Sequence, residues 1–107
     1  SEAVIKRGMK ASQLADLCAT NAAKRFGLYP RKGAVRVGAD ADLALVDMDC
    51  RWNYSRKDSL SKTKCTSFPY EGKEVLCRVT ETLVRGRTVY RDGAIWAVPG
   101  SGIFIKP

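Results

Sequence analysis

The sequence predicts an α+β fold in which helices come first and short strands follow. Residues 1–30 carry apolar side chains at helical spacing, whereas residues 31–107 alternate apolar and polar side chains between turn dipeptides. This order is typical of an α+β domain, or of helices that belong to one domain and strands that belong to another. A chain of 107 residues is long enough for one small domain. We therefore divide the chain into residues 1–30 and 31–107.

Three short helices are expected in residues 1–30. The first ends at Gly8, because glycine readily adopts the left-handed conformation that closes a helix. The hydroxyl of Ser12 is placed to cap the second helix by accepting from a free backbone N–H. In that helix Leu14, Leu17 and Cys18 form one apolar face at the spacing i, i+3 and i+4.

A break is predicted between the second and third helices, at Thr20 and Asn21. Asn21 is a good cap for a third helix over residues 22–26. Gly27 is expected to end that helix, with Leu28 folding back onto it. Pro30 prevents any continuation, because its ring clashes with the preceding helical turn and it has no N–H to donate.

Six strands are expected in residues 31–107, where β-branched and apolar residues recur in short runs between turn residues. Their ranges are 34–37, 43–46, 51–55, 75–84, 88–91 and 94–98. The apolar run 43–46 is expected to be buried on both faces of the sheet. Residues 58–72 are polar and have no clear period, so we expect a loop there.

Two turn signals separate the last strands. Asp92-Gly93 is the strongest turn dipeptide in the chain, and Arg85-Gly86-Arg87 is a second turn. Both lie between predicted strands and therefore indicate hairpins. Residues 99–102 are expected to form a loop, and residues 103–105 either a short edge strand or a docked tail.

The sequence contains no histidine, the commonest metal ligand and general base. Asp40, Asp42, Asp47 and Asp49 come closest to a cluster of ligands, and Asp47 and Asp49 would share a face of an extended strand. A calcium loop needs more oxygen donors and a glutamate in register downstream. We therefore expect these carboxylates to cap turns in solvent.

Candidate nucleophiles are present, but they lack a base. Two lysines beside Cys65 would lower the pKa of its thiol, and Ser61 and Ser67 offer hydroxyls. Without a histidine, neither a cysteine nor a serine site can be assembled. The glycine-containing segments 38–42 and 100–102 lack the strand–helix context and the lysine of a phosphate loop. We assign no catalytic, cofactor-binding or metal-binding residue to this chain.

The four cysteines show no CxxC spacing, and we expect buried free thiols at Cys18 and Cys77. A secreted domain with two disulfides is the alternative, but the N-terminal residues have no apolar signal core. No apolar run approaches the roughly 20 residues that span a bilayer. The sequence therefore predicts a cytoplasmic protein with no membrane partner.

Basic residues outnumber acidic ones by 19 to 11, which gives a formal net charge of +8. Aromatic and basic residues interleave at Arg51, Trp52, Tyr54, Arg56 and Lys57. Such a pattern would let a β-surface stack bases and contact phosphates. The same pattern also arises when a strand packs its aromatic residues inward, and we favour that explanation. Nucleic acid is therefore not an expected partner, although a basic nucleic-acid-binding β-domain is kept as an alternative.

Five stretches of the chain, in order, resemble motifs of one enzyme family. Residues 19–33, ATNAAKRFGLYPRKG, resemble N-P-A-K-x-F-G-L-x-P-x-K-G, with Ala22 in place of the family's proline. Residues 61–72 resemble S-K-x-x-x-x-P-Y/F-x-G, with an insertion before Pro69. The other three are 37–47, like V-G-x-D-A-D-L; 78–93, like V-x-x-T-x-V-R-G-x-x-V-Y-x-D-G; and 100–107, like G-x-G-x-F-L-x-P.

In this order the chain resembles the C-terminal segment of a cyclic amidohydrolase of the dihydropyrimidinase, hydantoinase, allantoinase and dihydroorotase group. The resemblance implies that residues 1–30 are terminal helices of a TIM-like barrel domain. It implies that residues 31–107 are part of a small β-sandwich, the composite domain of metal-dependent hydrolases, followed by a C-terminal tail. The missing partners would then be the N-terminal strands and the barrel of the parent protein.

The resemblance also implies a function. Members of the family hydrolyse the C–N bond of a cyclic amide with a metal-bridged hydroxide, usually on two zinc ions held at barrel strand ends. None of the five motifs supplies a ligand, so this chain alone is expected to hold no cofactor and to be inactive. The parent is expected to be a zinc-dependent homo-oligomer, and the sequence leaves its cyclic amide open. A non-catalytic amidohydrolase-like scaffold is the alternative within the same fold.

Overall fold

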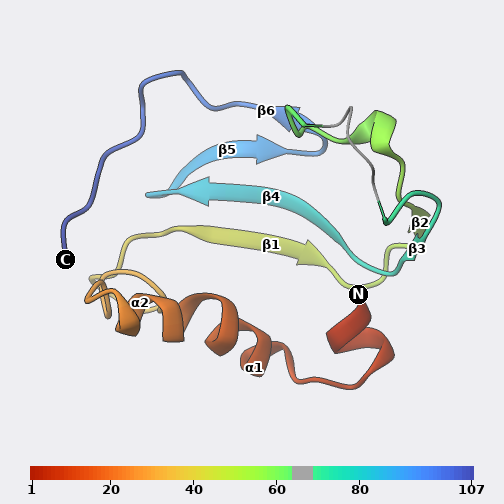
Figure 1. Cartoon of the computed structure of the whole chain (residues 1–107). Coiled ribbons are helices and arrows are strands. Elements are labelled where there is room, and N and C mark those ends of the chain that lie inside the picture. The colour runs from red at the N-terminus through yellow and green to blue at the C-terminus, as the bar shows by residue number, and fades with distance from the viewer. Residues whose placement is uncertain (64–68) are drawn as a thin grey trace.

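A computed structural model describes residues 1–63 and 69–107 of the chain. It consists of a helical unit and an antiparallel sheet, and the helices run along the β1 side of the sheet (Figure 1). The predicted order of helices before strands is therefore confirmed. The domain boundary at residue 30 stays a prediction. None of the helices in the described ranges is long and apolar enough to cross a membrane.

The helical unit contains one short helix and one longer helix instead of three separate helices. A single π-helical turn covers Glu2–Lys6. The longer helix begins with α1, Ala11–Ala15, widens into a π-helical stretch at Asp16–Thr20, and ends with α2, Asn21–Arg25.

The predicted break at Thr20 and Asn21 is wrong, because both residues have helical backbone angles. The Thr20 hydroxyl donates to the carbonyl of Gly33 at 2.8 Å and so makes a tertiary contact. Asn21 forms no cap. Ser12 is not a cap either: it lies inside α1, whose preceding residue is Lys10.

Both predicted glycine stops are confirmed by their backbone angles. Gly8 has φ +70° after the first helical turn, and Gly27 has φ +68° after α2. The N–H of Leu28 then donates to the carbonyl of Ala23 at 2.8 Å, so the chain folds back onto the helix as expected. This reversal sends the chain along the helix and towards the sheet.

The main sheet has the order β1-β4-β5-β6, and a two-stranded ladder pairs β2 with β3. All pairs are antiparallel. The strands are β1 Leu43–Asp47, β2 Trp52–Asn53, β3 Glu74–Val75, β4 Arg78–Val84, β5 Arg87–Arg91 and β6 Ala94–Ile95. A short 3₁₀ helix, Arg56–Asp58, follows β2.

Both predicted hairpins are present. Arg85 and Gly86 connect β4 to β5 with φ values of +49° and +75°, and Asp92 and Gly93 connect β5 to β6 with +47° and +88°. Two central residues with positive φ suit the right-handed twist of the adjoining strands. The turn dipeptides therefore identified the hairpins correctly.

Other predicted strands are shorter or missing in the described ranges. Residues 34–37 form no strand, because no neighbouring segment there pairs with them, and Val35 and Val37 are 88% and 100% exposed. The predicted strand 75–84 is divided between β3 and β4 by Leu76 and Cys77. The strands predicted at 51–55 and 94–98 are shortened to β2 and β6. Residues 103–105 form no edge strand.

The chain has almost no core. Ala23, at 6% exposure, is the one hydrophobic residue that is buried among those described. The run 43–46 is not buried on both faces as predicted, since Ala44, Leu45 and Val46 are exposed. The radius of gyration is 15.5 Å, against about 13 Å for a compact domain of this length. The described residues thus form regular helices and strands, but these elements do not pack into a compact domain.

Candidate functional site

Two of the predicted turn-capping aspartates meet a lysine in what we call the Lys32 cluster: Arg31, Lys32, Asp40 and Asp42. Lys32 Nζ lies 2.9 Å from Oδ2 of Asp40 and also pairs with Oδ2 of Asp42. Arg31 Nε lies 3.1 Å from the same Asp40 oxygen. These ion pairs connect the segment after the helix to the turn before β1.

Asp42 extends the Lys32 cluster to the β4–β5 hairpin. Its Oδ1 accepts from the backbone N–H of Arg85 at 2.8 Å. Beside it, the N–H of Gly86 donates to the carbonyl of Ala41 at 2.9 Å. The predicted turn-capping role is confirmed for Asp42, but the ion pairs across the fold were not foreseen.

The charges of the Lys32 cluster stabilise one another. The hydrogen bond from Lys32 holds the pKa of Asp40 below its ordinary value, and Arg31 adds to this effect. Burial opposes ionisation of Asp42, but hydrogen bonds from Lys32 and Arg85 outweigh it and lower the pKa of that carboxyl. Burial likewise opposes the charge on Lys32, yet its two aspartate partners raise its pKa. Near neutral pH the cluster is therefore fully charged, and its ion pairs connect the two ends of the segment between the helix and β1.

The other two aspartates do not form a ligand pair. β1 ends at Asp47, and the N–H of Asp49 donates to Oδ1 of Asp47 at 2.9 Å, so the pair closes a local turn. Within residues 1–63 and 69–107, no three His, Cys, Asp or Glu side chains gather as a metal-ligand set. These residues do not fit a zinc site, and we derive no step through zinc in this chain.

The described cysteines and serines show no nucleophilic arrangement. Cys50 and Cys77 are partly buried free thiols, whereas Cys18 is exposed, contrary to prediction, because the described part of the chain does not bury this position of the helix. Ser61 Oγ lies 2.9 Å from the hydroxyl of Thr63 in a local turn. The candidates Cys65 and Ser67 fall in residues 64–68, outside the described part of the chain.

The first two residues of the stretch of interleaved aromatic and basic residues, Arg51 and Trp52, make contacts within the protein. Trp52 Nε1 donates to the carbonyl of Cys77 at 3.0 Å, and the guanidinium of Arg78 lies 5.4 Å from its ring centroid. Arg51 pairs with Glu74 at 3.5 Å. The aromatic residue is thus partly buried between strands and its basic neighbour has an acidic partner, which favours the packing explanation over base stacking.

The two glycine-containing segments also have local roles. Ala39, next to Gly38, donates its N–H to the carbonyl of Arg36 at 3.1 Å. The carbonyl of Ser101 accepts from Arg85 Nη2 at 2.9 Å. Both segments are turns that receive or make backbone hydrogen bonds.

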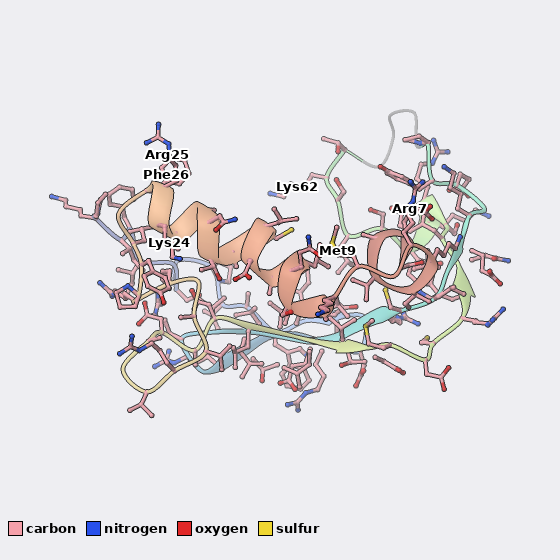
Figure 2. All side chains as sticks on the ribbon, turned by 90° about the horizontal axis from the view of Figure 1, so that it is seen from below. Arg7, Met9, Lys24, Arg25, Phe26 and Lys62 are labelled. Atoms are coloured by element: carbon pink, nitrogen blue, oxygen red, sulfur yellow. The ribbon has the colours of Figure 1, made fainter. Side chains whose placement is uncertain are left out.

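The most extensive feature is an uncovered apolar surface. Phe26 is 67% exposed and Phe104 is 84% exposed. Figure 2 shows Phe26 beside Arg25 at the end of α2, where both point outward. The accessible area is 8393 Å², against about 5,900 Å² for a compact protein of this mass. We use the term uncovered apolar surface for the exposed apolar side chains of three parts of the chain, taken together: the longer helix and its end, residues 35–37, and residues 95–104. The clearest members are Leu17, Phe26, Val35, Val37, Ile95, Trp96, Val98, Ile103 and Phe104.

An apolar groove of about 460 Å³ lies within this surface, between the longer helix and residues 33–35. Ala15, Ala19 and Phe26 line it from the helix, and Val35 lines it from the other side. The small helical side chains allow a close approach by another element. The sequence predicts this apolar helix face, and the family resemblance implies that it is exposed to solvent when the barrel is absent, as Leu17 and Phe26 are here. The groove itself was not predicted, because its far side comes from residues 33–35.

The sequence profile of the amidohydrolase family matches residues 2–89. An allantoinase from Rubrobacter xylanophilus is 40% identical over 101 residues, which cover 94% of this chain and 21% of that protein. Protein unc-33 from Caenorhabditis elegans is 34% identical over 110 residues, covering 98% of this chain and 12% of that protein.

Solved structures give the same result for the fold. A D-hydantoinase from Bacillus sp. AR9 superimposes with a TM-score of 0.82 and 36% identity, over 98% of this chain and 22% of that chain. The chain spans about a fifth or less of the length of the curated relatives that it matches.

Proposed function

The chain belongs to the amidohydrolase family, and we propose that it is the C-terminal structural segment of a cyclic amidohydrolase. The whole protein would hydrolyse a cyclic amide C–N bond, as an allantoinase, hydantoinase, dihydropyrimidinase or dihydroorotase does. This segment would supply terminal helices of a TIM-like barrel and part of a β-sandwich. The catalytic residues would lie elsewhere in the protein.

The observation that carries the proposal is the uncovered apolar surface. The whole chain, polar and apolar area together, exposes roughly 2,500 Å² more than a compact protein of its mass, against the ~800 Å² that one partner buries in a standard protein–protein interface. The large apolar side chains exposed within that area are typical of a surface that another part of a fold covers. The remainder of an amidohydrolase, several times longer than this segment, would cover it.

Two zinc ions are expected in the whole protein. Bound zinc supplies a hydroxide nucleophile at neutral pH and polarises the carbonyl of the substrate. The ligands would come from residues outside this chain. The role of this segment would be to stabilise the fold on which those ligands are placed.

The partners of the segment follow from the same proposal. Val35 and Val37 alternate with Ala34 and Arg36 as in a strand, but no described segment pairs with them. An N-terminal strand of the parent would complete this edge of a β-sandwich. The exposed C-terminal side chains Trp96 and Phe104 would meet either the parent or another copy in a homo-oligomer.

A segment exchange tests the proposal. The matching part of the Rubrobacter xylanophilus allantoinase is replaced by this chain, and the hybrid is assayed for bound zinc and for hydrolysis of allantoin, hydantoin, dihydrouracil and dihydroorotate. We expect a folded, zinc-loaded hydrolase. The control is the same enzyme with the segment deleted, which should aggregate and lose activity.

Two outcomes would contradict the proposal. One is a deleted control that folds and works as well as the hybrid, since the segment would then contribute nothing. The other is a hybrid that fails to assemble although the unmodified allantoinase does. A zinc-free native parent would point to a non-catalytic scaffold, and salt-sensitive binding of this chain to an oligonucleotide would point to the nucleic-acid alternative.

A further inference from the structure

The helical unit and the sheet are joined by few contacts. Within the described residues, helix and strand backbones approach one another only marginally. Residues 31–42, which we call the bridging segment, connect the end of α2 to the start of β1. At the N-terminal end of the helical unit, far from the bridging segment (Figure 1), Ser1 Oγ accepts from the N–H of Leu76 at 3.1 Å.

The bridging segment is fastened to the helix at its first residues. The N–H of Lys32 donates to the carbonyl of Leu28 at 2.9 Å. The carbonyl of Gly33 accepts from the Thr20 hydroxyl, and the Gly33 backbone lies so close to the helix that a Cβ there would come within 2.6 Å of Ala23 Cβ. This end of the segment moves with the helix.

The other end of the bridging segment is fastened to the sheet. Asp42 accepts the N–H of Arg85, and the carbonyl of Ala41 accepts the N–H of Gly86. Lys32, whose side chain is 17% exposed, then joins the two ends by pairing with both Asp40 and Asp42. The Lys32 cluster is therefore the place where helix and sheet are locked at one relative position.

We propose that the Lys32 cluster is an acid-released joint that fixes the helical unit against the β4–β5 hairpin. While its carboxylates are charged, Asp42 holds Lys32 and the hairpin together. When they are protonated, Lys32 loses both charged partners. The bonds that remain there are backbone ones, from the N–H of Asp40 to the carbonyl of Arg31 at 2.9 Å and from the N–H of Gly86 to the carbonyl of Ala41 at 2.9 Å. The helical unit then turns more easily about its contact at Ser1. The same joint would set the angle between barrel helices and sandwich, if the proposed function holds.

The charges that face the joint determine the pH range in which it is closed. Around the aspartates these are Lys32 and Arg31, and Asp40 also repels the charge on Asp42. From the hairpin, the N–H of Arg85 donates to Asp42, whereas the Arg85 guanidinium bonds to the carbonyl of Ser101. The pKa values of Asp40 and Asp42 lie below 3.8, so the joint weakens as the pH falls through those lowered values. The pKa of Lys32 lies above 10.5, so the joint weakens again as the pH rises through that raised value.

Hydrogen exchange resolved to single residues in the 107-residue chain tests the joint. In Asp42→Asn, the amides of Asp40, Arg85 and Gly86 should lose protection together, by at least about tenfold, as expected when a hydrogen bond to a charged group is lost. The amide of Leu76 at the far contact should keep its protection. The matched control is Asp47→Asn, because Asp47 accepts only a local N–H from Asp49 among the bonds described.

Several results would overturn the joint. Loss of protection at Arg85 and Gly86 but not at Asp40 would make Asp42 a local turn cap. An equal effect of Asp47→Asn, or no protection of these amides in the unmodified chain, would also overturn it. If Asp42→Asn unfolds, the unmodified chain is acidified instead. The amides of Asp40, Arg85 and Gly86 should then lose protection at a higher pH than the amides within strands β4 and β5. Loss of protection at all of these amides at the same pH refutes the proposal. None of these readouts depends on activity or on assembly with the parent, so the joint and the proposed function fail separately.

Discussion

Gly33 determines how closely the bridging segment can approach the helix. It has φ +76°, and an added Cβ would lie 2.6 Å from Ala23 Cβ and 2.9 Å from the carbonyl oxygen of Ala19. Both the backbone angle and the lack of space therefore require glycine. Lys32-Gly33 is a typical turn dipeptide, but nothing in its local pattern indicates that the turn packs on a helix 10 or more residues earlier in the chain.

Gly33→Ala is therefore expected to lower the free energy of unfolding by about 1–3 kcal/mol through overpacking and backbone strain. The measurement is the midpoint of urea unfolding followed by circular dichroism. Gly72→Ala is the matched control, because Gly72 also has positive φ, at +72°, but an added Cβ there meets nothing within 4 Å. Equal losses in both variants would show that backbone angle alone matters and that the close contact does not.

Glu81 gives the β4–β5 hairpin an acid-sensitive ion pair. Its Oε1 accepts from the Thr88 hydroxyl at 2.5 Å and from Arg91 at 2.6 Å, and these bonds hold its pKa below the ordinary 4.5. This contribution is complete above pH 4.5 and is lost as the pH falls through the lowered value. The pairing followed from strand register, which the sequence did not determine.

Glu81→Gln should remove this acid-dependent part of hairpin protection. Exchange of the amides of β4 and β5 is measured between pH 6 and pH 3, and the variant should change less over that interval than the unmodified chain. Glu74→Gln serves as the control, since Glu74 forms only a longer pair, 3.5 Å, with Arg51. An unchanged pH response in Glu81→Gln would contradict the assignment.

Predictions of single helices and strands from local sequence were correct where the pairing strand or helical turn lies next to the element in the chain. Turn dipeptides identified both hairpins because β4, β5 and β6 pair with sequence neighbours. Glycine identified both helix ends for the same local reason. The helix break predicted at Asn21 was wrong. The preference of Thr20 and Asn21 for cap positions stabilises a break less than the continued helix is stabilised by its hydrogen bonds and by tertiary contacts such as that between Thr20 and Gly33.

Strand predictions failed where a partner from elsewhere was needed. The alternation at Val35 and Val37 predicts a strand, but a strand requires a neighbour to accept its backbone hydrogen bonds. Within the described residues no such neighbour exists, so the segment stays irregular and exposed. Periodicity reports which side chains would share a face and cannot report whether the opposing element is present.

Trp52 joins the small β2–β3 ladder to the main sheet, and its loss tests that link. In Trp52→Phe the carbonyl of Cys77 loses its donor, which should cost about 1 kcal/mol of unfolding free energy. Urea unfolding measures the change. Trp96→Phe is the control, because Trp96 is 62% exposed and should tolerate the change. A larger loss in Trp96→Phe would mean that the C-terminal segment packs more tightly than its exposure indicates.

At the scale of the whole molecule, the chain behaves as part of a larger fold. An ordinary share of hydrophobic residues, 45% of the sequence, is present, but only Ala23 among the described ones is buried. That share of hydrophobic residues is ordinary for a chain that buries a core, yet the described residues do not form one. The family motifs succeeded where composition failed, because they report the fold to which the segment belongs.

The isolated chain should therefore be marginally stable and self-associating. It is expected to bind a hydrophobic dye, to sediment as mixed oligomers and to melt over a broad range. In this state Leu17→Ala should change stability by less than about 1 kcal/mol, since the side chain is 55% exposed. In the segment-exchange hybrid the same substitution should cost about 2–5 kcal/mol, as for a buried leucine. A sharp, monomeric melt of the isolated chain would contradict this expectation.

Capture of the native protein from its source, with an antibody against this segment, gives its intact mass and metal content. These two values decide whether the segment belongs to a working hydrolase. Because the segment covers 22% of an allantoinase relative, we predict a polypeptide of roughly five times 11.8 kDa, carrying bound zinc. Such a result would make this chain the structural end of a working hydrolase. A native product of 11.8 kDa without metal would contradict the account, because the uncovered apolar surface would then have to be explained by a separate binding partner.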